Sequence, residues 1–157
     1  PVTCSDHRQA APAPFVRPVV EIPLPAVAAK NAAQHRMWLC DTGCPHDLIG
    51  KEDCSQSQIQ QSRPAPLPVI LETANGEIHA DTVIDLQITT FQENIMPFLL
   101  ESSPDVLSIG MRCEAMGYQF TWPAYSGKPY FVTPAGKKVE LVSEQFVPYL
   151  VDKHNVP

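Results

Sequence analysis

Alternating apolar and polar positions predict strands through the middle of the chain. Over residues 78–88, apolar or small side chains occupy every second position, and charged or polar side chains fill most of the gaps. This two-residue period is typical of a half-buried strand, and Val83 alone breaks it. Asn75-Gly76, just before this segment, favours a hairpin turn, so we expect residues 67–73 to form the preceding strand.

Shorter apolar runs, separated by turn residues, predict the remaining strands. A short helix over residues 111–116 would end at Gly117, and residues 51–63 predict a loop with a short helix. The 17 prolines against 7 glycines interrupt long helices. We therefore expect an all-β fold with one or two short helices. The predicted strands lie at residues 15–22, 37–40, 91–100, 118–122, 130–133 and 139–142.

The length of 157 residues fits one domain. Six prolines among the first 25 residues predict a flexible arm over residues 1–14. We assign residues 15–122 to the main domain and residues 123–157 to a C-terminal β extension at an interface or over a cleft. Aromatic side chains near the C-terminus would serve the core or a dimer interface. They are Trp122, Tyr125, Tyr130, Phe131 and Tyr149.

The formal charge of −6 is unevenly distributed along the chain. Residues 1–40 carry four basic and two acidic groups, and the remainder carries seven and fifteen. An acidic main domain repels phosphate backbones, so we expect no nucleic-acid partner. Five cysteines and the absence of a signal peptide or a long apolar stretch favour a protein of the reducing cytoplasm with no membrane partner.

The candidate chemistry lies at Asp41-Thr42-Gly43, which directly follows the apolar run 37–40. A strand would fix the backbone, Gly43 would allow a sharp turn, and the Thr42 hydroxyl can form local hydrogen bonds. Hydrolysis of a peptide without a metal needs one group to take a proton and another to give one. Two carboxylates that share a proton do both. The motif occurs once, so the second carboxylate would come from a two-fold related copy.

Three segments in order resemble landmarks of a known family. WLCDTGCPHDLIG looks like the active-site segment of retropepsins. LETANGEIHADTVIDLQI and SSPDVLSIGMRCEAMGY resemble later segments of proteases in copia-like retrotransposon and retroviral-type Gag-Pol polyproteins. The resemblance runs from Met37 to Trp122 and implies a closed-barrel aspartic endopeptidase that works as a homodimer without a cofactor or metal. Its substrate would be an extended polypeptide, cleaved in polyprotein processing and self-release, in the cytoplasm or within retroelement particles.

The resemblance also implies roles for individual residues. Asp41 would be the shared acid and base, Thr42 would brace the two active-site loops, and Gly43 would shape the turn. A flap over the substrate would be formed by Ala74, Asn75 and Gly76. Structural support beneath the active-site loop would come from Ile109 and Gly110.

Several alternatives stay open at the level of sequence. Cys44 replaces the small residue usual after the glycine, and the flap has one glycine, which favours a catalytically weak or domesticated dimerisation or peptide-binding module. A zinc site at Cys40, Cys44, His46 and Cys54 lacks the usual spacing. Redox control through Cys40 and Cys44 competes with a buried structural role for Cys40. A Cys-His nucleophile lacks a local signature, and an RNA-binding fragment conflicts with the acidic charge. Asp47 and Asp105 would be turn-capping or solvated groups.

Overall fold

The computed structural model describes residues 35–73 and 76–153, in which strands dominate and helices are few and short. The all-β expectation is confirmed at this level, whereas the predicted arm over 1–14 and strand over 15–22 lie outside the described residues. The strands are β1 His35–Asp41, β2 Leu48–Gly50, β3 Arg63–Thr73, β4 Gly76–Val83, β5 Leu86–Ile88, β6 Glu93–Ile95, β7 Phe98–Leu100, β8 Val106–Ser108, β9 Gln119–Thr121, β10 Tyr130–Val132, β11 Lys138–Glu140, β12 Val142–Glu144 and β13 Val147–Lys153. The helices are η1 Lys51–Asp53, α1 Gln56–Gln60 and α2 Ile109–Ala115.

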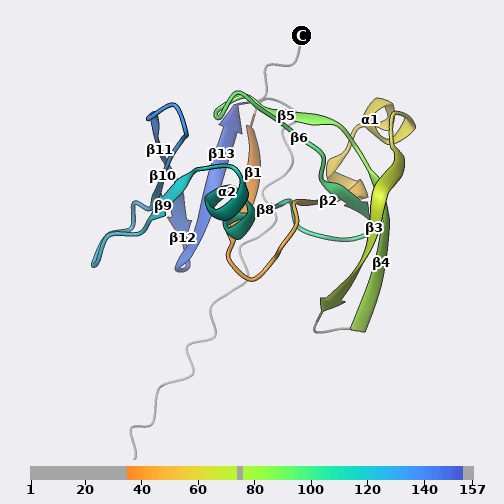
Figure 1. The fold of residues 1–157 in the computed structure, drawn as a ribbon, viewed down its shortest axis with the longest axis horizontal. Helices are drawn as coiled ribbons and strands as arrows, with labels where there is room; N and C mark the ends of the chain where they lie inside the picture. The colour runs from red at the N-terminus through yellow and green to blue at the C-terminus, as the bar shows by residue number, and fades with distance from the viewer. Residues whose placement is uncertain (1–34, 74–75, 154–157) are drawn as a thin grey trace, which may run out of the picture. The chain divides into compact units, whose positions relative to one another are not determined.

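The main sheet has eight strands in the order β12-β13-β1-β8-β2-β7-β4-β3. One half of this sheet is β12-β13-β1-β8 and the other is β2-β7-β4-β3. In Figure 1 the two halves lie on either side of the loop that leaves β1, and the β3–β4 hairpin extends from the second half. Between β2 and β8 the halves are joined through one pair of register partners, Leu48 and Val106. The smaller sheets are β11-β10-β9 and β5-β6.

The expected closed barrel is not what the described chain forms. Closure would require β3 to pair with β12, and these strands stand at opposite ends of the strand order. The narrow join at Leu48 and Val106 lets the two halves diverge instead of curling into a ring. Residues 35–73 and 76–153 therefore form an open sheet, and the two-fold dimer stays a prediction.

The core lies beneath β1 because alternate side chains of this strand point inward. Trp38 and Cys40 are buried, in keeping with the two-residue period of a strand. They pack with Leu107 of β8 and Leu150 of β13, which are almost completely buried. The strand that ends at Asp41 is thus held between two neighbours over a closely packed interior.

Helix α2 follows β8 without a connecting loop. It begins at Ile109, two residues earlier than expected, because Ser108 caps it: the Ser108 hydroxyl accepts the N–H of Met111 at 3.1 Å. The chain leaves the helix through Gly117, whose φ of 74° favours glycine, as the sequence predicted. No helix within residues 35–73 and 76–153 is long and apolar enough to cross a membrane.

The C-terminal residues contribute a strand that the sequence did not predict. Strand β13 pairs antiparallel with β1 on one side and with β12 on the other. Pro148 cannot donate a ladder hydrogen bond, but it lies near the start of β13, opposite Ser143 of β12, where the strand tolerates it. The domain boundary at residue 122 stays a prediction, yet residues beyond it lie beside the strand that carries Asp41.

Candidate functional site

Asp41 is the last residue of β1, where the strand runs parallel to β8 and Asp41 is the register partner of Ser108. Its side chain is half-buried. The Gly43 N–H donates a 2.7 Å hydrogen bond to Asp41 Oδ1, so the turn fixes the carboxylate that precedes it. The structure therefore joins Asp41 and Gly43 in one turn, and their catalytic roles stay a prediction.

A hollow of about 450 Å³ opens beside Asp41. Thr42 lies at its edge, and Ile109, which is 5% exposed, contributes to its wall from α2. Gly110, the second residue of α2, is partly exposed and is not among the lining residues. Asp41 is the sole acidic or basic side chain among the described lining residues, so its charge faces apolar surroundings. The lining comprises Leu39, Cys40, Asp41, Thr42, Ile109, Phe120, Trp122, Phe146, Val147 and Pro148.

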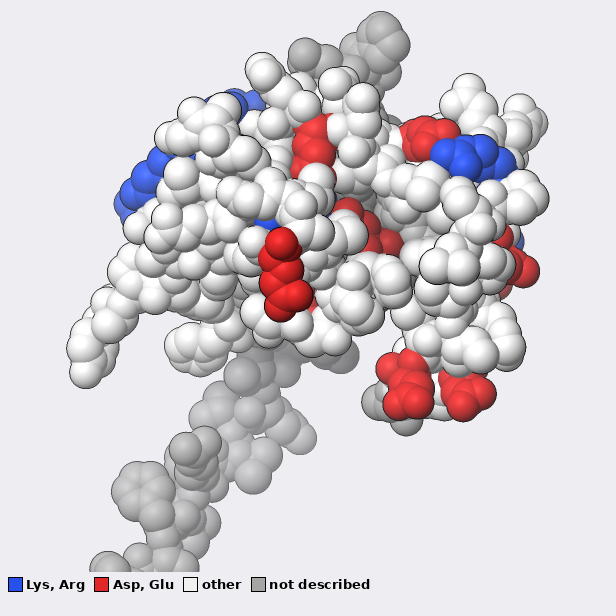
Figure 2. Space-filling model, viewed as in Figure 1, with Lys and Arg blue, Asp and Glu red and all other residues white. Residues whose placement is uncertain are grey.

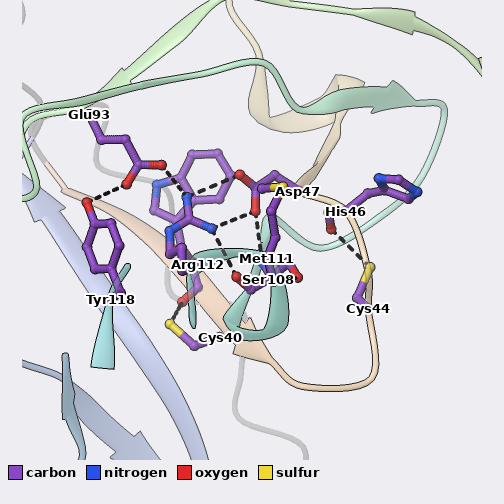
Figure 3. Close-up of polar contacts among 10 residues, drawn as sticks. Cys40, Cys44, His46, Asp47, Glu93, Ser108, Met111, Arg112 and Tyr118 are labelled. Atoms are coloured by element: carbon purple, nitrogen blue, oxygen red, sulfur yellow. Dashed lines mark hydrogen bonds and ion pairs between the residues drawn. The ribbon is translucent and has the colours of Figure 1, made fainter. Parts of the chain in front are cut away.

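A buried ion pair holds the loop that follows Asp41 (Figure 3). Arg112 of α2 donates from Nη1 to Asp47 Oδ1 at 2.8 Å and from Nη2 to Asp47 Oδ2 at 3.1 Å. Asp47 Oδ1 also accepts the backbone N–H of Ser108 at 2.8 Å. The end of β8 and helix α2 thus both contact the Asp47 carboxylate, which ties the end of the loop after Asp41 to the base of α2.

The network continues to two further side chains (Figure 3). Arg112 Nη2 donates to Glu93 Oε1 at 3.0 Å, and the Tyr118 hydroxyl donates to Glu93 Oε2 at 2.7 Å. Burial lowers the pKa of Arg112, but the hydrogen bond and charge of Asp47, with the charge of Glu93, offset this and raise it overall. Burial and the bond to Glu93 raise the pKa of Tyr118. Arg112 therefore stays charged and Tyr118 stays protonated.

Sequence reasoning missed this network. Asp47 was expected to be a turn-capping or solvated residue, but it is 4% exposed and paired with Arg112. Asp105 is also buried, and its Oδ2 lies 3.5 Å from Arg36 Nε, so the solvated interpretation fails for it as well. The signal available in the sequence was a single arginine, Arg112, in a short predicted helix shortly after the apolar segment 106–109. Only the fold identifies the partners of this arginine.

The cysteines near the loop have different surroundings. Cys40 is 3% exposed, and burial raises the pKa of its thiol to about 12, which fits the interpretation of a small buried side chain. Cys44 is half-buried, and burial also raises the pKa of its thiol, which donates to the His46 carbonyl at 3.1 Å. Within residues 35–73 and 76–153, no group of three His, Cys, Asp or Glu side chains is arranged to hold a metal.

The predicted flap corresponds to the end of the β3–β4 hairpin. Ala74 and Asn75 lie outside the described residues, whereas Gly76 begins β4 with a φ of 113°, a conformation that favours glycine. Thr73 Oγ1 donates to the Gly76 carbonyl at 2.8 Å and helps to close the hairpin. Acidic side chains gather at this end (Figure 2), where Glu72 and Glu77 are register partners.

A second hollow, of about 410 Å³, lies between the base of this hairpin and α2. Its walls are largely apolar, with Asp47, Glu93 and His46 as the ionisable groups among the described lining residues. Three of the lining residues are methionines, whose flexible side chains can adapt to different shapes. The apolar lining is formed by Ala65, Pro66, Leu67, Val69, Val83, Ile95, Met96, Phe98, Met111 and Met116.

No protein-family model and no curated protein matches this chain. Function is therefore argued from the site itself, since a fold alone does not determine an activity. The site presents one carboxylate, fixed by a turn and surrounded by apolar side chains. One carboxyl group acts as an acid when it is protonated and as a base when it is ionised, but it cannot be both at the same time.

Proposed function

We propose that the chain is an aspartic endopeptidase that acts as a two-fold homodimer, with Asp41 of each copy in a shared active site. The observation that carries the proposal is the placement of Asp41 at the end of an inner strand, fixed by Gly43 and set in an apolar hollow. A solvated turn carboxylate would need none of these supports.

A second copy would complete the chemistry. Two carboxylates held close together cannot both ionise easily, so the pair retains one proton between them. The ionised member would take a proton from a water molecule held between them, and the protonated member would donate to the carbonyl oxygen as the water attacks the peptide carbon. The apolar lining strengthens these electrostatic interactions because it excludes competing water.

The buried pair of Asp47 and Arg112 supports this geometry from below. It anchors the end of the loop that begins at Asp41, so the two catalytic loops would meet in a defined arrangement. Removing this anchor would leave Gly43 in place but free the loop beyond it. The pair therefore acts as a positioning element and does not touch the reacting atoms.

The substrate would be an extended polypeptide. The β3–β4 hairpin would close over it, and backbone hydrogen bonds would hold it as an added strand. The hollow between the hairpin and α2 favours apolar side chains, because Asp47 and Glu93 in its wall are already paired with Arg112. Cleavage of a Gag-Pol type polyprotein, in the cytoplasm or within particles, is the activity that the sequence resemblance favours.

The test is cleavage of a denatured, unbiased protein substrate by the 157-residue chain and by its Asp41→Asn variant. We expect Asp41→Asn to abolish cleavage while the urea midpoint and the dimer are retained. A peptide inhibitor with a hydroxyl in place of the scissile carbonyl should bind the unmodified chain tightly and the variant weakly. Activity should also fall at high pH, where both carboxylates are ionised. Undiminished cleavage by Asp41→Asn would refute the mechanism.

The competing function is a dimerisation or peptide-binding module that retains the fold without the reaction. Cys44, in place of a smaller residue after Gly43, is the feature that favours it. Such a module would dimerise and bind peptides but would neither cleave them nor prefer the hydroxyl inhibitor over a matched peptide. Substitution of Cys44 by alanine tests the same point, because restored cleavage would assign the defect to this side chain.

A further inference from the structure

The turn between β12 and β13 carries an unusual pair of residues. Glu144 and Val147 are register partners, so Gln145 and Phe146 form a two-residue turn. Their φ angles are 49° and 66°. This left-handed conformation favours Asn-Gly in two-residue hairpins, and bulky side chains adopt it with strain.

Phe146 is also almost completely exposed, at 93%. An aromatic ring in water gains none of the free energy that burial would provide. Strained backbone and an exposed ring at one position are unfavourable for a free chain, and strained residues cluster where function requires them. The turn therefore has the properties of a surface that is covered in the working state.

The ring of Phe146 borders the hollow that contains Asp41. The strand register explains this placement, because Leu39 pairs with Tyr149 and the chain direction then brings Val147 towards the Asp41 end of β1. Trp122, which is 37% exposed, also lines this hollow. In Figure 1 the β12–β13 turn and the loop after β1 project from the same side. One face thus carries both a protruding ring and an apolar hollow.

We propose that the β12–β13 turn is a dimer clasp, in which Phe146 of each copy packs against the partner subunit beside the paired Asp41 residues. The inference rests on the proposed function, which requires the partner's Asp41 to approach this face. A two-fold interface joins a surface to itself, so a patch that carries both a protrusion and a hollow can be self-complementary. The scarcity of charge around Asp41 also fits the core of an interface, where charged residues are depleted.

The test measures association of the full 157-residue chain in an Asp41→Asn background, which prevents self-cleavage. Sedimentation velocity over a range of concentrations gives the dimer Kd with and without Phe146→Gly. We expect Phe146→Gly to weaken association at least about 100-fold, because both copies lose a buried aromatic ring. The urea midpoint of the monomer should not fall, since glycine relieves the strained turn.

Tyr125→Gly is the matched control. Tyr125 is fully exposed and has a φ of 56°, but it is not among the residues that line the Asp41 hollow. We expect its removal to leave the dimer Kd unchanged. With Asp41 intact, Phe146→Gly should lower activity at low enzyme concentration, and high enzyme concentration should restore it.

Each contrary outcome has a distinct meaning. An unchanged dimer Kd in Phe146→Gly rejects the clasp and leaves the proposed function standing. A change confined to KM also rejects the clasp, because the Phe146 ring would then belong to a substrate site. An equal effect of Tyr125→Gly rejects it too, because general surface apolarity would then explain association. Persistent cleavage by Asp41→Asn rejects the proposed function, and a chain that stays monomeric at every concentration rejects both.

Discussion

Arg112→Met tests whether the buried ion pair holds the candidate site together. Arg112 is completely buried and donates two hydrogen bonds to Asp47, one to Glu93 and one to the Ser108 carbonyl. Methionine retains much of the apolar stem but leaves two carboxylates without their cation. Breaking a buried pair by removing one partner costs roughly 3–5 kcal/mol, a large share of the stability of a domain this size. We expect a loss in this range at pH 7.

The loss should depend on pH in a definite direction. Without Arg112, the charges of Asp47 and Glu93 are buried and close together with no cation between them, and protonation of either carboxylate relieves this repulsion. The folded variant then retains protons that the unfolded chain releases, so its stability is greatest at low pH and falls as pH rises. The deficit should therefore be smaller at pH 4 than at pH 7.

Urea unfolding, followed by the fluorescence of buried Trp38, measures both effects. Arg63→Met is the matched control, because Arg63 pairs with Asp85 at the surface and the pair is exposed. We expect no measurable loss there, since exposed ion pairs contribute little. If Arg112→Met lost less than about 1 kcal/mol, below the range for a broken buried pair, or if its deficit did not change with pH, the stabilising role of the pair would be refuted.

Two further predictions concern neighbouring positions. Gly50→Ala should destabilise the chain by about 1–3 kcal/mol in the same urea assay, because a Cβ there would lie 2.4 Å from the backbone oxygen of Ser103. Gly127→Ala is the control and should be neutral, because a Cβ at that position would meet open space. Burial raises the pKa of Cys40 from 9.0 to about 12. The contribution of this thiol to folding stability is therefore fully present below pH 9 and is lost as the pH rises towards 12, because the unfolded chain releases the proton first. Cys40→Ala should flatten that decline, and an unchanged alkaline profile would contradict the assignment.

Local signals in the sequence were sufficient for several elements, including the strand that ends at Asp41. The apolar run 37–40 predicted the strand that ends at Asp41. The two-residue period of residues 78–88 predicted one strand, which the structure divides into β4 and β5 in different sheets. Gly117 marked the end of α2 because a left-handed residue there favours glycine. These features depend on neighbours in the chain, and a pattern of a few residues carries that information.

The features that escaped prediction depend on residues far apart in the chain. Strand β13 was obscured by Pro148 and by Asp152, a buried acid on its inward face that breaks the apolar pattern. The Asp152 carboxylate accepts hydrogen bonds from the backbone N–H groups of Thr89 and Thr90. These donors lie some 60 positions away in the chain and satisfy the buried carboxylate. Asp47 and Arg112 are likewise 65 positions apart.

The same long-range contacts change what the C-terminal segment means for the site. Strand β13 lies beside β1 along five register pairs, and its turn brings Phe146 to the edge of the Asp41 hollow. The hollow beside Asp41 is therefore lined by residues from both sides of the boundary drawn at residue 122. Asp41 ends β1, and β1 pairs with β13. Under our proposal, the turn at the start of β13 contacts the partner when the Asp41 carboxylates of two copies meet. Catalysis and association would then depend on one continuous part of the sheet.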